Sequence, residues 1–381
     1  MSGLWLSSLT LSAFRNYVSA KLTLPPGPVV LTGENGAGKT NCLEALSLLS
    51  PGRGMRRAAY EDMLHAGGGA PWAVSAVLET PDGPVRIGTG LKAGAGLSQR
   101  VVRVDGEPAS INSLGEHLQV LWLVPAMDGL FTGAAGDRRR FIDRLVLAAD
   151  PGHAARVTAF ERVMRDRNRV LEDACADPAW LDALETQLSE QGVAVAIARR
   201  DAVARLSLTI ERIRKEYPGD PFPFAEIGMA GDFEMMIARG AAVEAEDEYR
   251  AVLHSERRRD RAAGRTLSGP HRSDLIVRHG PKQMEARLCS TGEQKALLIG
   301  LILAHATNVA TLHNGRAPLL LLDEVAAHLD SVRRGALFSR ILAMECQAFM
   351  TGTDTALFNA LGGEAAFFSV ENGVLRPVPD G

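Results

Sequence analysis

Residues 33–40 read Gly33-Glu34-Asn35-Gly36-Ala37-Gly38-Lys39-Thr40 and match the pattern G-x-x-x-x-G-K-[ST]. An apolar run, 29–31, precedes them, and an amphipathic run, 42–49, follows them. Glycines let the backbone turn tightly and aim successive N–H groups at a phosphate, and the following helix adds the partial positive charge of its N-terminus. The stretch therefore predicts a phosphate-binding loop between a strand and a helix. An incidental glycine-rich turn is the alternative.

Two side chains of this loop carry its expected chemistry. Lys39 is expected to bridge the β- and γ-phosphates of ATP, and the Thr40 hydroxyl is expected to ligate Mg²⁺. The backbone N–H groups of the loop would bind the phosphates. ATP and Mg²⁺ are therefore the cofactors that the sequence predicts.

A pair of acidic residues follows a second apolar run. Asp323 and Glu324 come directly after the four leucines 319–322. Such a run is typical of a central parallel strand whose carboxylates lie at its C-terminal edge. Asp323 would hold Mg²⁺ through water, and Glu324 would polarise the attacking water. A surface turn after a core strand is the alternative.

A third motif opens a long apolar helix. The run Ser290-Thr291-Gly292-Glu293-Gln294-Lys295 resembles the signature motif of ABC ATPases, although taken alone it is also an ordinary helix capping box. In ABC proteins this motif contacts the nucleotide of the other subunit, so the resemblance implies that two chains sandwich two ATP molecules. Residues 326–330 then resemble the D-loop, with Asp330 at the dimer seam.

The chain of 381 residues falls into three regions. Strand patterns dominate up to about residue 125, helical spacing dominates from about 127 to 265, and strands alternate with helices from 267 onward. We expect one α/β P-loop ATPase head of the ABC and Rad50 type, made of 1–125 and 266–381 and split by a largely helical arm, 126–265. Sustained heptads are missing and the helical region spans only about 140 residues, so we expect a compact arm rather than a long coiled coil.

The charge pattern restricts how the chain could bind nucleic acid. The formal net charge is −3, so any DNA site must be a local patch rather than a general property of the surface. Arginines form small groups along the chain, and Arg53, Arg56 and Arg57 lie just beyond the phosphate loop and its helix. These three are candidate DNA contacts, and solvated helix faces are the alternative.

The cysteines and the apolar runs indicate the compartment. The four cysteines, Cys42, Cys175, Cys289 and Cys346, form no C-x-x-C pair, which suggests neither a zinc site nor a disulfide framework. The first residues do not read as a signal peptide. The longest apolar run, 296–304, is shorter than the ~18 residues of a membrane span. We therefore expect a cytoplasmic, nucleoid-associated protein with no membrane contact.

Residues along the whole chain resemble the RecF family within the SMC and Rad50 group of ATPases. The similar elements are Phe14-Arg15-Asn16-Tyr17, Arg138-Arg139-Arg140-Phe141-Ile142-Asp143, Ser268-Gly269-Pro270-His271-Arg272-Ser273-Asp274 and Thr351-Gly352-Thr353-Asp354. Comparable residues of Rad50-like heads contact the nucleotide, so the resemblance implies this role for Arg15 and Asn16. Anchoring of the first hairpin is the alternative role.

This resemblance implies a function in DNA repair, recombination and replication. ATP would close a head-to-tail homodimer on double-stranded DNA and on single/double-strand junctions. The bound dimer would act with RecR, and with RecO and RecA, to load RecA on single-stranded DNA. Hydrolysis would reset the dimer, as expected of a weak, DNA-stimulated ATPase.

Two departures from ABC transporters point to slow hydrolysis. Gly352 or Thr353 stands where those proteins have a switch histidine, and no glutamine lies near 124–128. Two other classes stay open at this point. One is the ATP-binding subunit of a membrane transporter, and the other is the structural head of an SMC-like complex.

Overall fold

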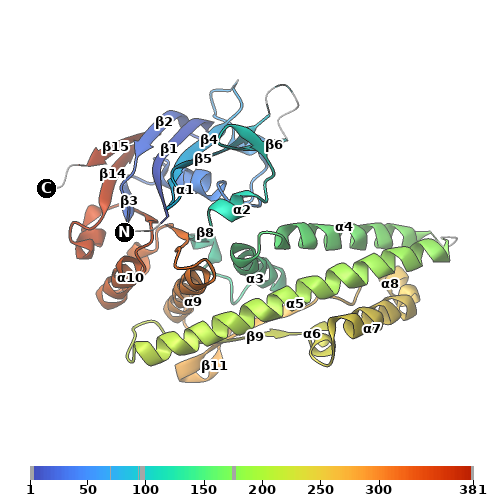
Figure 1. Ribbon diagram of the computed structural model, residues 1–381. Coiled ribbons are helices and arrows are strands. Elements are labelled where there is room, and N and C mark those ends of the chain that lie inside the picture. Colours follow the sequence, from blue (N-terminus) through green and yellow to red (C-terminus); the bar gives the residue numbers. More distant parts are fainter. Residues whose placement is uncertain (1–3, 69, 93, 95–98, 174–176, 379–381) are drawn as a thin grey trace. The chain divides into compact units, whose positions relative to one another are not determined.

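The computed structural model describes residues 4–68, 70–92, 94, 99–173 and 177–378 (Figure 1). The chain divides into two compact units. The first consists of Met1–Asp128, Arg212–Phe224 and Ser290–Gly381, and the second of Gly129–Glu211 and Ala225–Cys289.

The boundaries of these units differ in detail from the expected division. Residues 266–289 group with the second unit, because strand β10 (Asp274–His279) pairs along its length with β9 (Ala225–Ala230). Residues 212–224 group with the first unit. The division into an ATPase head, 1–125 and 266–381, and a helical arm, 126–265, remains a prediction.

An antiparallel sheet opens the first unit. Its strand order is β2-β1-β4-β5-β6-β7. The strands are β1 (Trp5–Phe14), β2 (Tyr17–Thr23), β4 (Ala73–Glu79), β5 (Val85–Leu91), β6 (Arg100–Val104) and β7 (Glu107–Ala109). Buried residues alternate with less buried ones along β4, as expected of a sheet with one face on the core.

A second, mostly parallel sheet carries the functional residues. Its order is β15-β14-β3-β13-β12-β8, and its pairs are parallel except β14 with β15. The strands are β3 (Val29–Thr32), β8 (Val120–Leu123), β12 (Leu319–Leu322), β13 (Ala348–Gly352), β14 (Ala366–Glu371) and β15 (Val374–Val378). The strands β3, β8, β12 and β13 are buried throughout, which explains their continuous apolar sequence. Their carboxyl ends meet at one edge, where α/β sheets place ligands.

Short helices connect these strands. The first unit contains α1 (Lys39–Ser47), α2 (Leu114–His117), α9 (Thr291–Leu312) and α10 (Ser331–Ala343). Short 3₁₀ turns lie at η1 (Glu61–Met63), η2 (Pro125–Met127), η5 (Ala326–His328) and η6 (Thr355–Leu361). Phe338 of α10 stacks on Phe358 of η6 with ring centroids 5.8 Å apart, which fixes these two elements to each other.

Helix α9 is the most apolar helix of the chain. Among the described residues it is the one helix long and apolar enough to cross a membrane, and 67% of its most apolar window is buried inside the protein. The apolar run 296–304 continues in uncharged residues to Leu312, so the apolar stretch is longer than the sequence analysis gave it. A helix that is hydrophobic all round is also what a protein core requires.

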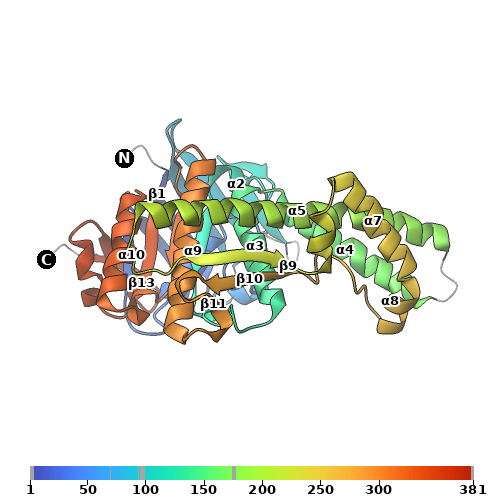
Figure 2. The ribbon, with the colours of Figure 1, turned by 90° about the horizontal axis from the view of Figure 1, so that it is seen from below.

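The second unit is mostly helical, as expected for the middle of the chain. Its helices are α3 (Ala135–Ala149), α4 (His153–Glu172), α5 (Pro178–Glu216), α6 (Asp232–Ile237), α7 (Ala242–Ser255) and α8 (Arg257–Ala263), and the last residues of α5 belong to the first unit. Figure 2 shows α5 as one continuous helix. A small sheet, β11-β10-β9, with β11 at Met284–Glu285, completes the unit together with the turns η3 (Gly280–Lys282) and η4 (Ala286–Leu288).

A buried ionic cluster holds the helices of the second unit together. Arg167 is fully buried and bonds Glu185 at 3.0 Å and Asp260 at 2.7 Å, and both carboxylates are only 1% exposed. Arg167 also donates to the Leu253 carbonyl oxygen at 2.7 Å. Removing one partner of such a cluster would leave a buried charge unpaired, so the cluster fixes how these helices pack.

Candidate nucleotide-binding site

The phosphate loop forms between β3 and α1, as the sequence predicted. Gly38 has φ +120° and caps α1, and a Cβ there would lie 2.5 Å from Asn16 Nδ2. Gly33 has φ +152°, and a Cβ there would lie 2.3 Å from the Val370 carbonyl oxygen. Both positions therefore require glycine, for backbone conformation and for space.

Lys39 lies inside this loop. Its Nζ donates to the carbonyl oxygens of Gly33 at 2.6 Å and of Glu34 at 2.9 Å, and its side chain is buried. Burial lowers the pKa of Lys39, and the nearby carboxylates of Glu324 and Asp323 oppose that shift. The loop residues 34–36 are exposed, so the loop backbone is open to a ligand.

Two hydroxyl groups converge on Asp323. Thr40 Oγ1 donates to Asp323 Oδ1 at 3.1 Å, and Thr351 Oγ1 donates to the same oxygen at 2.8 Å. Asp323 is 5% exposed, and burial raises its pKa while the two hydroxyl donors lower it. Parallel pairing of β12 with β13, with Leu322 opposite Met350, brings Thr351 beside Asp323.

These oxygens suit a magnesium ion. The Thr40 hydroxyl oxygen could ligate Mg²⁺ directly, and Asp323 Oδ1, which lies 3.1 Å from it, could hold the ion through a bound water. No group of three or more His, Cys, Asp or Glu side chains that could hold a metal occurs among the described residues. A Mg²⁺ that takes its other ligands from phosphate and water needs no such group.

Glu324 follows Asp323 in a strained backbone conformation. Its φ is +54°, and its backbone N–H donates to Thr351 Oγ1 at 2.8 Å. A non-glycine residue with left-handed backbone costs about 1–3 kcal/mol and occurs often at functional sites. The sequence analysis mentioned Thr351 as part of a family-like element but gave it no role. Here its hydroxyl group contacts both acidic residues.

Arg15 and Asn16 support the loop from the end of β1. The Arg15 guanidinium donates to both carboxylate oxygens of Glu44 at 2.9 Å, and Glu44 is fully buried in α1. Asn16 Nδ2 donates to the Ala37 carbonyl oxygen at 2.9 Å, and its Oδ1 accepts a hydrogen bond from Asn41. Both residues therefore anchor the loop and its helix, and their contact with a nucleotide stays a prediction.

The three arginines of the basic segment after α1 differ in their contacts. Arg56 donates to Asn41 at 2.9 Å and to Glu44 at 3.3 Å. Arg53 is exposed and lies 5.8 Å from the centre of the Tyr60 ring, while Arg57 is exposed with φ +54°. A DNA contact by this segment stays a prediction.

The buried Arg100 of β6 holds this basic segment in place. Its guanidinium donates to the carbonyl oxygens of Gly52 at 2.5 Å and of Ser50 at 3.3 Å. It also donates to the Thr89 hydroxyl at 2.7 Å. No local sequence pattern indicates this role, because Arg100 lies about 50 residues from the carbonyl groups that it binds.

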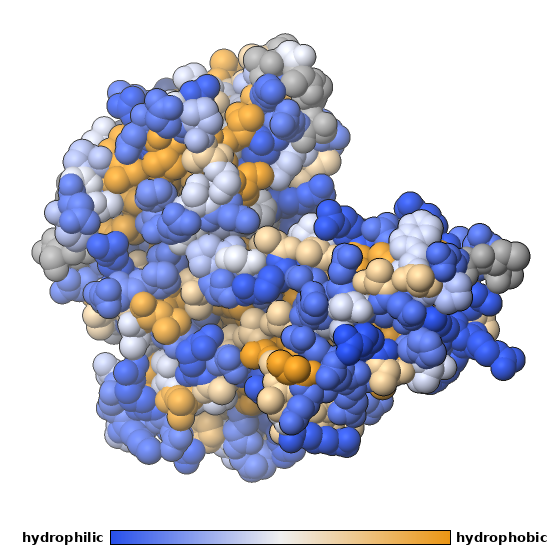
Figure 3. All heavy atoms as spheres, turned by 45° about the vertical axis from the view of Figure 1, so that its right-hand side comes forward, coloured by the Kyte–Doolittle hydropathy of each residue, from blue (hydrophilic) through white to orange (hydrophobic). Residues whose placement is uncertain are grey.

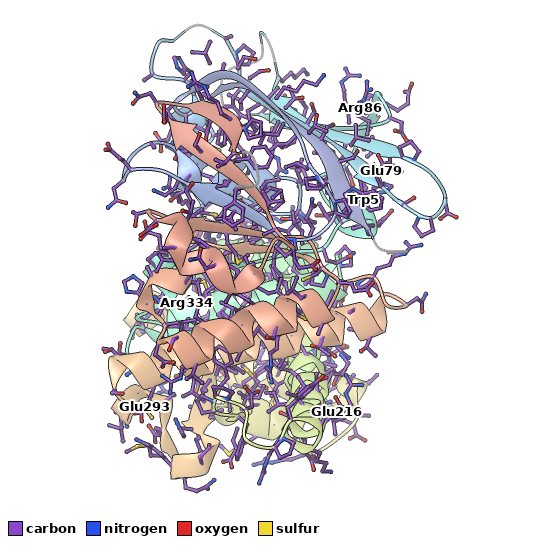
Figure 4. The ribbon with its side chains drawn as sticks, turned by 90° about the vertical axis from the view of Figure 1, so that its left-hand side faces the viewer. Trp5, Glu79, Arg86, Glu216, Glu293 and Arg334 are labelled. Atoms are coloured by element: carbon purple, nitrogen blue, oxygen red, sulfur yellow. The ribbon has the colours of Figure 1, made fainter. Side chains whose placement is uncertain are left out.

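The signature-like run begins helix α9. Ser290 is the N-cap, and its backbone N–H donates to Glu293 Oε2 at 3.0 Å, so the run does form a capping box. Thr291 and Gly292 are exposed, and a Cβ on Gly292 would meet nothing within 4 Å. Figure 4 shows the Glu293 side chain at the start of this helix. Space is therefore available for another molecule to approach the turn.

Asp330 occupies a comparable place on α10. It is exposed and caps this helix, accepting a hydrogen bond from the Arg333 backbone at 2.9 Å. The adjoining turn η5 connects it to the acidic pair after β12. Its position at a dimer seam stays a prediction.

The family-like elements of the second unit contact each other. Arg138 binds both carboxylate oxygens of Asp274 at 2.8 Å, although the two residues are 136 positions apart. Arg199 binds Asp143 at 2.7 and 2.8 Å and the Pro270 carbonyl oxygen at 2.7 Å. The segments 138–143 and 268–274 therefore form one hydrogen-bonded cluster.

The fold and the loop geometry together define a P-loop ATPase head of the SMC type. The family model described as "RecF/RecN/SMC N terminal domain" matches residues 5–376. A solved SMC head domain of Pyrococcus furiosus, with 15% sequence identity, covers 98% of the chain and 96% of its own length with a TM-score of 0.54. The expected α/β ATPase fold split by a helical insertion is confirmed.

More similar proteins identify the branch of this group. The chain is 54% identical over 376 residues to "DNA replication and repair protein RecF" of Mesorhizobium japonicum, covering 98% of both chains. It is 55% identical over 371 residues to the protein of the same name from Brucella suis, covering 97% of the chain and 95% of the relative. The structure named "recombination mediator protein RecF-ATPrS in RecFOR pathway" covers 99% of both chains with a TM-score of 0.85 at 20% identity. The chain belongs to the RecF family.

Proposed function

We propose that this chain is an ATP-dependent DNA-binding protein of recombinational repair and replication, in which ATP closes a head-to-tail homodimer. The observation that carries the proposal is the exposed turn 290–292, which has open space at Gly292. In a member of this family, such a turn is available to contact the nucleotide held by the phosphate loop of a second copy. Each chain then contributes half of two identical sites.

The residues around the phosphate loop support ATP as the ligand. The loop backbone and Lys39 would bind the phosphates, Thr40 would ligate Mg²⁺, and Asp323 would hold the ion through water. Bound there, the ion neutralises charge on the phosphate oxygens during transfer. Glu324 orients and polarises the attacking water, and Thr351 keeps its backbone in place.

Hydrolysis is slow in this proposal, because one usual contact is missing. A Cβ at Gly352 would lie 2.6 Å from the Phe358 ring, so no histidine fits at that position, and Thr353 is exposed. A weak, DNA-stimulated ATPase would act as a timer that opens the dimer.

The ligand of the closed dimer is duplex DNA, including single/double-strand junctions. Contacts would go mainly to phosphates, so the affinity falls with salt and depends little on base sequence. Arg53 and Arg57 have exposed side chains for this role. By family resemblance the chain acts in the cytoplasm, on the nucleoid, with RecR and with RecO and RecA.

The two alternative functions lack a supporting observation. A transporter subunit is not favoured, because the family model and the relatives named RecF match nearly the whole chain. A structural SMC head is not favoured, because the longest helix, α5, has 39 residues and packs within the protein rather than forming an extended coiled coil.

Mass in solution tests the proposed dimer. Light scattering of the wild type, of Lys39→Ala and of the exposed-lysine control Lys21→Ala is measured without nucleotide, with ATP, and with ATP plus duplex DNA. We expect ATP to dimerise the wild type and Lys21→Ala but not Lys39→Ala. A wild type that stays monomeric under every condition contradicts the proposal.

A further inference from the structure

Residues 268–273, which directly precede β10 in the second unit, form a loop that requires glycine at position 269. Gly269 has φ +132°, and a Cβ there would lie 2.2 Å from Tyr249 Oη. The Tyr249 hydroxyl donates to the Ser268 carbonyl oxygen at 2.8 Å, and Tyr249 is fully buried. The start of the loop is therefore fixed against the core of its unit.

Charged side chains fix the rest of the same loop. Arg199 donates to the Pro270 carbonyl oxygen and Arg139 to the Ser273 carbonyl oxygen, each at 2.7 Å. The His271 ring also bonds the Thr266 carbonyl oxygen at 2.9 Å. Four side chains thus hold one short loop, which presents its exposed residue in a single orientation.

That exposed residue is Arg272. Its backbone N–H closes the turn on the Gly269 carbonyl oxygen at 2.9 Å, but its guanidinium makes no hydrogen bond or ion pair with any residue that the structure describes. The neighbouring loop residues 269, 270 and 273 are buried. Several hydrogen bonds therefore hold the loop in a conformation that exposes the positive charge of Arg272.

Like charges surround Arg272, while the nearby carboxylates have other partners. Burial, then the positive charge of Arg199 and, less strongly, that of Arg272, lower the pKa of Arg139, while Asp274 and Asp143 oppose the shift, so Arg139 lies close enough to Arg272 for the two positive charges to repel. Asp143 is bonded to Arg199, and Asp274 is bonded to Arg138. An anion bound at this point would relieve the repulsion.

We propose that Arg272, supported by Arg139, contacts a phosphate group of the backbone of duplex DNA. This inference rests on the proposed DNA-binding function and assigns a contact to the second unit. A phosphate contact requires only a placed positive charge, whereas a protein interface requires apolar side chains at its core. The loop 268–273 exposes no large apolar side chain, and hydrophilic residues cover most of the face drawn in Figure 3.

Salt-dependent DNA binding tests this contact. Fluorescent duplexes of two unrelated sequences are titrated with the wild type, Arg272→Ala, Arg272→Lys and the control Arg162→Ala in the presence of ATP, at several salt concentrations. Arg162 is exposed on α4 and, among the described residues, makes no side-chain hydrogen bond or ion pair.

The expected results follow from counterion release. Each chain of the dimer carries one Arg272, so Arg272→Ala removes two phosphate contacts from the bound dimer. The slope of log affinity against log salt should become shallower by about 1.8, which is roughly a 60-fold loss of affinity near 0.1 M salt. Arg272→Ala should show this loss equally on both sequences, and Arg272→Lys should recover most of it, because a phosphate contact depends mainly on charge. Arg162→Ala should match the wild type, and ATP-dependent dimerisation should be unchanged in all variants.

Three outcomes would overturn the assignment. Arg272→Ala could keep wild-type affinity and slope, could lose affinity with an unchanged slope, or could lose no more than Arg162→Ala. A wild type that binds neither duplex would instead refute the proposed DNA-binding function itself.

Discussion

The Thr351 hydroxyl should be necessary for the catalytic geometry of the site. Thr351 is 1% exposed, donates to Asp323 Oδ1 at 2.8 Å and accepts from the Glu324 backbone N–H at 2.8 Å. Thr351→Val keeps the shape of the side chain but removes both hydrogen bonds. It also leaves the Glu324 N–H without this partner, in a backbone conformation that is already strained.

The size of the effect follows from these two bonds. A hydrogen bond to a charged carboxylate contributes about 1.5–3 kcal/mol and a neutral one about 0.5–1.5 kcal/mol, so we expect the free energy of unfolding to fall by about 2–4 kcal/mol. Turnover of ATP should fall by roughly 10–100-fold, because small displacements of a catalytic group have effects of that order. The KM for ATP should change less, because Lys39 and the loop stay intact.

Urea denaturation and phosphate release with Mg²⁺ and ATP measure the two effects. Thr351→Ser should restore both, since its hydroxyl group can make the same bonds. Thr23→Val is the matched control, because Thr23 is exposed at the end of β2 and is not part of the phosphate loop. Wild-type turnover and stability in Thr351→Val would refute the role of this hydroxyl group.

Three further predictions concern other parts of the chain. Gly38→Ala should abolish ATP binding in an equilibrium titration, because its Cβ would clash with Asn16 at 2.5 Å; wild-type affinity would contradict this. Arg167→Leu should lower the free energy of unfolding by about 3–5 kcal/mol in urea, because it leaves the buried Asp260 without its positively charged partner, while Glu185 keeps Arg257; a loss below 1 kcal/mol would be evidence against the cluster. Burial raises the pKa of Cys42 to about 12, so its thiol should resist iodoacetamide at neutral pH and react only after unfolding, as peptide mass analysis would show.

Local patterns explain why the phosphate loop could be predicted from the sequence. The glycines of residues 33–38 are required by their own backbone angles and near neighbours, and the leucine run 319–322 is long enough to identify a buried strand. Helical spacing likewise predicted the helices of the second unit. These features depend on residues that are adjacent in the chain.

Contacts between distant segments could not be predicted in the same way. The role of Thr351 depends on the register of β12 with β13, and the partner of Arg15 lies 29 residues away in α1. Arg138 and Asp274 are 136 positions apart. The sequence placed these residues only in family-like elements, because a local pattern does not identify a partner that lies far away in the chain.

The small sheet of the second unit shows the same limit. Helical spacing dominates from about 127 to 265, yet the strand β9 forms at Ala225–Ala230 within this region. Its partner β10 comes more than 40 residues later, so pairing with β9 draws 266–289 into the second unit. The boundary at 265 was predicted from the change in residue pattern along the chain. In the structure, the pairing of β10 with β9 determines which unit residues 266–289 contact.

The most direct test of the shared nucleotide site is a mixing experiment with two inactive variants. Lys39→Ala removes the phosphate-binding lysine, and Gly292→Asp places a negative charge on the exposed turn, where the open space should leave the fold of the same chain intact. In a head-to-tail dimer of the two variants, one site combines both defects and the other is intact. Because Lys39→Ala does not dimerise with itself, intact sites arise in mixed dimers, each with one intact site of two. ATPase activity of an equal mixture should therefore return to at most about half of the wild-type level, although each variant alone is inactive. A mixture that stays as inactive as its parts would contradict a site built from two chains.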